Sequence, residues 1–116
     1  MITVYQIRLS DRDIVEANSH QFRDPPRFDA YRQMAFSGHS AWKNEYAQYY
    51  TPVMEIETDD LNDAFDAANG YSESTVRRLS PGHSGSVGDI FVKDGDCYIV
   101  DPMGFTNIGH YELGAK

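Results

Sequence analysis

The chain has 116 residues and a formal net charge of -8, a length that fits one domain over residues 1–116 with a core of its own. Hydrophobic residues make up 41% of it and aromatic residues 13%, which excludes an intrinsically disordered chain. One cysteine excludes an internal disulfide and a cysteine-based zinc site within one chain, and favours a reducing compartment.

The N-terminal residues and the length of the apolar runs indicate where the protein is expected in the cell. The start, MITVYQIRLS, lacks the basic region and apolar core of a signal peptide. No apolar run approaches the roughly 20 residues that span a bilayer. We therefore expect a cytoplasmic protein with no membrane partner.

The first predicted elements are a strand and a short helix. β-branched and aromatic residues alternate roughly over 2–9 and predict the strand. Ser10 and Asp13 have the spacing of a capping box, which predicts a helix ending near Asn18.

A second helix is predicted from Asp24, its expected cap, to Gly38, its expected stop. Apolar side chains recur at helical spacing within it, at Phe28, Tyr31, Met34 and Ala35. Residues 39–50 remain open between helix and strand. Trp42, Tyr46 and Tyr49 fall on one helical face and are expected in the core; the alternative is that the aromatic cluster supplies interface anchors beside the acidic segment. The alternation in residues 50–58 then predicts a strand, in which Val53 and Glu55 face away from Met54 and Ile56.

The clearest predicted helix starts at a cap on Thr58 or Asp59 and stops at Gly70. Its apolar stripe is Leu61, Ala64, Phe65 and Ala68. Its expected solvent-facing residues are Asn62, Asp63 and Asp66. Residues 71–79 are expected to form a loop or a weak strand.

The C-terminal third predicts three antiparallel strands. DIFV and CYIV are separated by KDGD, whose Asp-Gly pair is typical of a hairpin turn at Gly95. DPMG predicts a second turn, with FTNIGHYEL as the third strand. Cys97, in the second strand, is expected to be a small core residue. The predicted fold class is therefore α+β: a small antiparallel sheet with a C-terminal meander, packed against two to four short helices.

The stretch HSGSVGD contains the residue types of a hydrolytic triad in His83, Ser84, Ser86 and Asp89. They lie within seven positions, whereas triads are assembled from distant segments. We therefore predict a tight turn in which the two serines bond backbone amides and the aspartate anchors the loop. A small hydrolase using His83 or His110 with Asp89 or Asp101 is the enzymatic alternative.

No pattern indicates a metal or a cofactor. The four histidines include no H-x-x-x-H pair, and no window fits an EF-hand loop. The glycines of SPGHSGSVGD lack the spacing of a phosphate-binding loop. We assign no catalytic residue, no metal ligand and no cofactor.

Charge is concentrated in one part of the chain. Residues 44–76 contain eight acidic residues and no basic one, and the flanking segments are nearly neutral. This disfavours direct nucleic-acid binding, which depends on neutralising phosphates, and favours a protein partner with a basic surface. The residues expected to contact it are Tyr49, Tyr50, Glu55, Glu57, Asp59, Asn62, Asp63 and Asp66.

The stretch HSGSVGDIFVKDGDCYIVDPMGF resembles the C-terminal signature of the YodL-like domain family. The matching positions are Ser84, Ser86, Val87, Gly88, Asp89, Tyr98, Val100, Asp101, Gly104 and Phe105. VYQIRL and DDLNDAFDAANG are similar, more loosely, to elements of phage and plasmid relatives. The resemblance implies a small bacterial or mobile-element protein that interferes with host proteins, including the actin-like cell-shape machinery. It transfers no catalytic residue, and its matching residues are expected to form the scaffold.

The leading hypothesis is a non-enzymatic protein that binds and modulates a bacterial host protein. The alternatives are a DNA mimic that inhibits restriction or CRISPR systems, a virion or self-associating structural protein, and the hydrolase described above. Homo-oligomerisation stays open.

Overall fold

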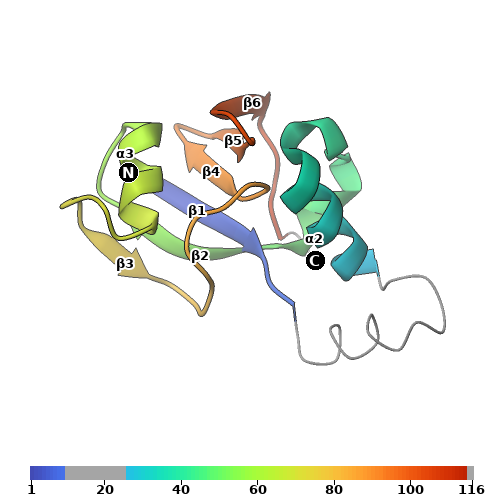
Figure 1. The fold of residues 1–116 in the computed structure, drawn as a ribbon, viewed down its shortest axis with the longest axis horizontal. Helices are drawn as coiled ribbons and strands as arrows, with labels where there is room; N and C mark the ends of the chain where they lie inside the picture. Colours follow the sequence, from blue (N-terminus) through green and yellow to red (C-terminus); the bar gives the residue numbers. More distant parts are fainter. Residues whose placement is uncertain (10–25, 115–116) are drawn as a thin grey trace.

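The computed structural model describes residues 1–9 and 26–114, in which six strands form one antiparallel sheet (Figure 1). The strands are β1 (Ile2–Ile7), β2 (Tyr50–Ile56), β3 (Val76–Arg78), β4 (Ile90–Lys93), β5 (Asp96–Val100) and β6 (Phe105–Gly109). Their order across the sheet is β3-β2-β1-β4-β5-β6. The predicted α+β fold with a C-terminal meander, β4–β5–β6, is confirmed.

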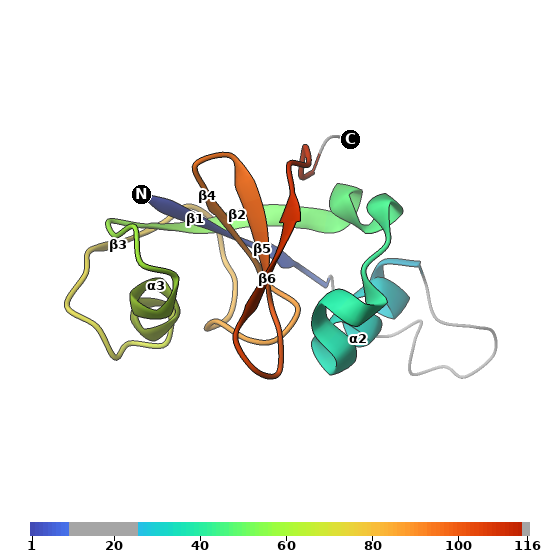
Figure 2. The ribbon, with the colours of Figure 1, turned by 90° about the horizontal axis from the view of Figure 1, so that it is seen from above.

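Two α-helices and two short 3-10 helices accompany the sheet in the described ranges. They are α2 (Pro26–Ser37), η1 (Gly38–Ala41), η2 (Asn44–Tyr49) and α3 (Leu61–Ala68). Figure 2 shows α2 and α3 on the same side of the sheet, near opposite ends of β1 and β2, with the β5–β6 turn projecting between them. The helix predicted to end near Asn18 lies outside the described residues, and so does the predicted cap at Asp24.

Strand β2 contains a bulge opposite β1. Val4 pairs with Met54 but Tyr5 pairs with Pro52, so Val53 is an extra residue. Val53 and Met54 are consequently both buried, and the predicted alternation across them is wrong. A bulge also tolerates Pro52, whose missing N–H would weaken a regular ladder.

Helix α3 begins immediately after Asp60, whose carboxylate accepts a hydrogen bond from the Asp63 amide at 3.0 Å. The prediction of Thr58 or Asp59 as the cap is therefore wrong by one or two residues. The Thr58 hydroxyl instead accepts from the Asp60 amide at 3.2 Å, a turn that leads into the cap. Gly70, at a φ of +80°, follows the helix as predicted.

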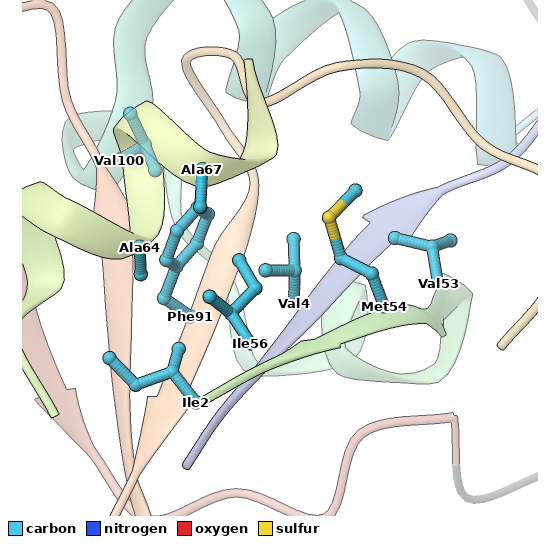
Figure 3. Packing of buried hydrophobic residues seen from close by; sticks show 9 residues of the cluster. All are labelled: Ile2, Val4, Val53, Met54, Ile56, Ala64, Ala67, Phe91 and Val100. Carbon is cyan, nitrogen blue, oxygen red and sulfur yellow. The ribbon is translucent and has the colours of Figure 1, made fainter. Parts of the chain in front are cut away.

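One hydrophobic cluster fills the space between α3 and the sheet (Figure 3). Its fully buried members are Ile2, Val4, Val53, Met54, Ile56, Ala64, Ala67, Phe91 and Val100. The Phe91 ring lies 5.5 Å from the Phe105 ring and 6.3 Å from the Phe65 ring, measured between centroids. Burying a side chain of this size contributes about 1.5–3 kcal/mol to stability.

A second cluster lies where α2 and η2 meet the sheet. Tyr46 is buried there, and Trp42 and Tyr49 are partly buried against it, as expected of core residues. The predicted common helical face is wrong, because Trp42 lies between η1 and η2. Cys97 is fully buried in the same cluster, as expected.

Helix α2 lies with its backbone directly on Gly88. A Cβ atom at Gly88 would stand 2.7 Å from the Met34 carbonyl carbon and 2.8 Å from its oxygen. This contact centres the buried face of α2 on Ala30 and Met34. Ala35, predicted on the buried face, is therefore exposed.

We expect Gly88→Ala to lower the free energy of unfolding by roughly 2–5 kcal/mol, since it combines overpacking with a strained positive φ. Gly104→Ala is the matched control, because Gly104 has a φ of +81° but a Cβ atom there would have no neighbouring atom within 4 Å. In that control the free energy of unfolding should fall only by the cost of backbone strain, roughly 1–2 kcal/mol. Urea denaturation of both variants measures the difference, and equal losses would contradict the proposed contact.

Candidate functional site

A cleft of about 250 Å³ opens between α3 and the turn that joins β5 to β6; we call it the α3 cleft. Helix α3 lines one wall with Asn62, Phe65 and Asp66. The loop before β4, the end of β5 and the following turn complete the lining with Val87, Val100, Asp101, Pro102, Gly104 and Phe105. None of these lining residues is basic.

The helical repeat explains which residues of α3 line the cleft. Asn62 and Asp66 are four residues apart and share one face of the helix, where both are exposed. Phe65 is half-buried beside them, and its ring meets the Phe105 ring edge-on at 6.4 Å. The cleft therefore has polar atoms at its rim and aromatic carbon at its base.

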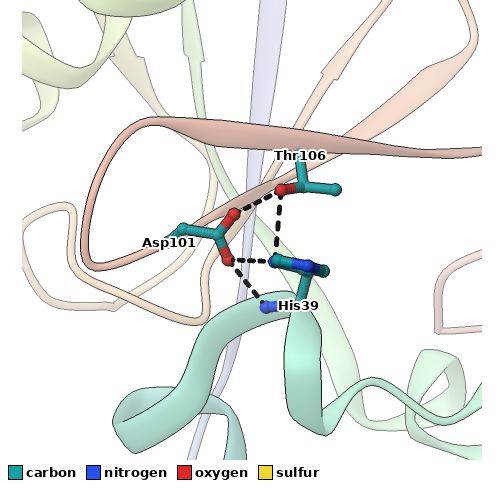
Figure 4. Close-up of polar contacts among 3 residues, drawn as sticks. All are labelled: His39, Asp101 and Thr106. Atoms are coloured by element: carbon teal, nitrogen blue, oxygen red, sulfur yellow. Dashed lines mark hydrogen bonds and ion pairs between the residues drawn. The ribbon is translucent and has the colours of Figure 1, made fainter.

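The side of the cleft opposite α3 includes Asp101, whose side chain is only 9% exposed and whose carboxylate is turned toward His39 and Thr106 (Figure 4). Its Oδ1 accepts the His39 amide at 2.8 Å and lies 2.9 Å from His39 Nδ1, while Oδ2 accepts from the Thr106 hydroxyl. Burial opposes ionisation of Asp101, but these hydrogen bonds outweigh it and hold the pKa below its usual value. Asp101 is therefore a fixed negative charge at neutral pH.

Gly38 allows this side of the cleft to form. Its φ is +62°, and a Cβ atom there would lie 3.1 Å from the Asp101 Cα and closer still to the carboxylate. The residue predicted only as a helix stop is thus also the point where the β5–β6 turn approaches the end of α2.

The HSGSVGD stretch is tied to β1 through a buried polar pair. Asp89 Oδ2 accepts from Gln6 Nε2 and from the Ser86 amide, each at 3.0 Å. Gln6 also exchanges hydrogen bonds with the backbone of His83, at 2.9 and 3.0 Å. The predicted anchoring role of Asp89 is confirmed. The predicted serine contacts are corrected: Ser86 contributes its amide, and Ser84 contributes its carbonyl, which accepts from Gln6 at 3.4 Å.

The remaining scaffold residues stand in the turns expected of them. Asp94 and Gly95 have φ values of +51° and +83°, which match the two-residue type of hairpin turn predicted from Asp-Gly. Gly104 closes the next turn, because its carbonyl accepts from the Asp101 amide at 2.9 Å.

The histidine–aspartate pairs considered for a hydrolase do not form in the described part of the chain. His83 Nδ1 lies 2.7 Å from the Ser84 carbonyl oxygen, and His110 Nδ1 lies 2.8 Å from that of Gly95. The pair that does form is His39 with Asp101. Its geometry differs from a triad, because Asp101 and Thr106 both approach the same ring nitrogen, whereas a triad places base and nucleophile on different nitrogens.

Three of the predicted contact carboxylates already have partners within the chain. Asp59 lies 2.8 Å from the N-terminal ammonium, and Glu55 forms an ion pair with an arginine of β3. Asp63 accepts from the hydroxyls of Ser72 and Ser74, both at 2.6 Å, and these bonds lower its pKa. Part of the acidic segment is therefore already engaged in contacts within the chain.

One of the two predicted tyrosine contacts, Tyr50, is corrected by its burial. Tyr50 is 1% exposed and its hydroxyl donates to the Gly88 carbonyl at 2.6 Å, so its ring is not presented to a partner. Tyr49 is half-buried, with the Arg27 guanidinium 5.3 Å from its ring centroid. Glu57 is exposed just after β2. Of the predicted contact residues, only Asn62 and Asp66 are brought to the α3 cleft.

His39, Thr106 and the apolar lining of the cleft were not predicted as site residues. His39 is 62 residues from Asp101, and no local pattern in the sequence connects them. Phe65 had a usable signal, since its position between Asn62 and Asp66 places an aromatic residue at the edge of the polar face.

Metal ligands and membrane spans can be assessed only for residues 1–9 and 26–114. Within these ranges no three His, Cys, Asp or Glu side chains gather as a metal site would require. No helix there has the length and apolar character needed to cross a bilayer.

Comparisons of the chain with protein-family models, with curated proteins and with solved structures found no significant match. The likeness to the YodL-like family therefore rests on the residues quoted above.

Asp89 generates a prediction for the pH dependence of stability. Burial raises its pKa to about 7, and the hydrogen bonds from the Ser86 amide and Gln6 offset this only in part. The folded protein thus binds this proton more tightly than the unfolded chain does. The free energy of unfolding should fall as pH rises from about 4 to about 7, by at most about 1.4 kcal/mol per pH unit.

Asp89→Asn should flatten that slope, since the amide oxygen can still accept from Gln6 and Ser86 but the group no longer titrates. Urea denaturation of both proteins across this pH window measures the effect. An unchanged slope in the variant would assign the pH dependence to other groups.

Proposed function

We propose that this chain is a non-enzymatic protein that binds a basic surface of a bacterial host protein and modulates that protein. The observation that supports it is the α3 cleft, in which the rings of Phe65 and Phe105 lie beside the exposed residues Asn62 and Asp66 and no lining residue is basic. A basic side chain entering it gains apolar contact for its stem and complementary charge for its head. The YodL-like resemblance adds the expectation of a phage or mobile-element protein acting in the host cytoplasm.

The same geometry gives less support to DNA mimicry. A mimic needs uncommitted carboxylates spaced along an extended surface, so that they stand in for phosphates. Glu55, Asp59 and Asp63 instead contact groups of their own chain. Contact with a single basic side chain of a partner fits this distribution of carboxylates better than contact along an extended DNA-binding surface.

Self-association is a second candidate, favoured by the three most exposed large hydrophobic side chains among the described residues. Phe36, Tyr71 and Met103 are 86%, 84% and 91% exposed. They come from α2, the loop after α3 and the β5–β6 turn, and large exposed apolar groups of this kind are common in interfaces. Sedimentation velocity at increasing protein concentration separates this candidate from a monomeric binder.

Asp66→Asn should weaken capture of a basic partner from bacterial lysate, roughly two- to fivefold in affinity, because it removes one exposed ion pair. Asp94→Asn removes the same charge from the exposed β4–β5 turn, at the other end of β5 from the cleft, and is the matched control. Quantitative mass spectrometry at low and moderate salt identifies the partner, and titration with the purified partner measures the affinity. Equal affinities of the two variants would remove the cleft from the binding surface.

A further inference from the structure

We infer that the α3 cleft receives a single arginine side chain, paired with Asp66 and lying against the aromatic base of the cleft. This inference rests on the proposed function, and it specifies the chemistry of the partner residue. It is carried by three features of the cleft: its size, its aromatic base and the different roles of its two carboxylates.

The size of the cleft suits one long side chain. The cleft has a volume of about 250 Å³. That is below the roughly 300–1,000 Å³ typical of pockets for small-molecule ligands and cofactors. One side chain projecting from a partner surface fits this space.

The base of the cleft favours a guanidinium over an ammonium. The rings of Phe65 and Phe105 meet there edge-on, so an aromatic surface is available to an entering cation. A guanidinium is planar and weakly hydrated, and it stacks on aromatic rings at a small desolvation cost. The ammonium of lysine is a compact and strongly hydrated charge, which loses more when it leaves water.

The two carboxylates have different roles. Asp66 is exposed and stands one helical turn from Asn62, so a planar guanidinium can pair with the carboxylate while it donates to the amide oxygen. Both oxygens of Asp101 are already bonded to His39 and Thr106. Asp101 therefore lines the cleft without offering a free carboxylate oxygen, and Asp66 makes the direct contact.

The test is a titration of the full chain with Nα-acetylarginine methylamide, followed by amide proton–nitrogen NMR. The backbone signals of Phe65, Val87 and Gly104 should shift with a dissociation constant on the order of 1 mM, as expected for a ligand of this size. The citrulline analogue has nearly the same shape as the arginine probe but no charge. The lysine analogue has the charge but lacks the planar guanidinium group. We expect both to bind several-fold more weakly.

Variants assign the contact to Asp66. Asp66→Asn should weaken binding of the arginine probe about fivefold, whereas Asp94→Asn should leave it unchanged. The inference is overturned if the cleft signals do not shift with the arginine probe, if the citrulline or lysine analogue binds equally well, or if the Asp66 variant binds as the wild type does.

Failure of this inference is distinguishable from failure of the proposed function. If a protein partner is bound in an Asp66-dependent way while the arginine probe leaves the cleft unshifted, the proposed function stands and the arginine assignment falls. If the probe binds as expected but binding of the captured partner is insensitive to Asp66→Asn, the cleft recognises a guanidinium and the proposed binding surface is wrong.

Discussion

The carboxylate of Asp101 holds together parts of the chain that are far apart in the sequence. It receives the His39 amide and ring at the end of α2 and the Thr106 hydroxyl at the start of β6. The absence of a side chain at Gly38 makes this approach sterically feasible. The β5–β6 turn is thereby positioned between the two helices (Figure 2). Residues of this turn line the cleft opposite α3.

Much of the fold could be predicted because local patterns determine it. The Asp-Gly turn, the glycine stops and the alternating runs predicted the meander and α3 from neighbouring residues alone. The bulge at Val53 could not be predicted, because it depends on the register of β2 against β1. The buried face of α2 was misassigned for a similar reason, since its contact with Gly88 joins residues more than 50 positions apart.

The candidate site was predictable only in part. Helical spacing placed Asn62 and Asp66 together on a polar face, and both line the cleft. The remaining acidic residues were grouped by their proximity in the sequence, but folding gives each a different neighbour. Asp63 bonds serine hydroxyls, and Glu55 meets the first arginine after the acidic segment because β3 pairs with β2. A run of charge in the sequence therefore overstated the charge available on one surface.

Strand β3 determines how the sheet ends on that side. It has three residues, all exposed, and pairs only with β2 among the described strands. Two of the three are arginines, of which Arg77 is paired with Glu55 of the neighbouring strand, and charged side chains on a very short edge strand disfavour pairing with another chain. Growth of the sheet by edge-to-edge addition of strands is consequently disfavoured at β3.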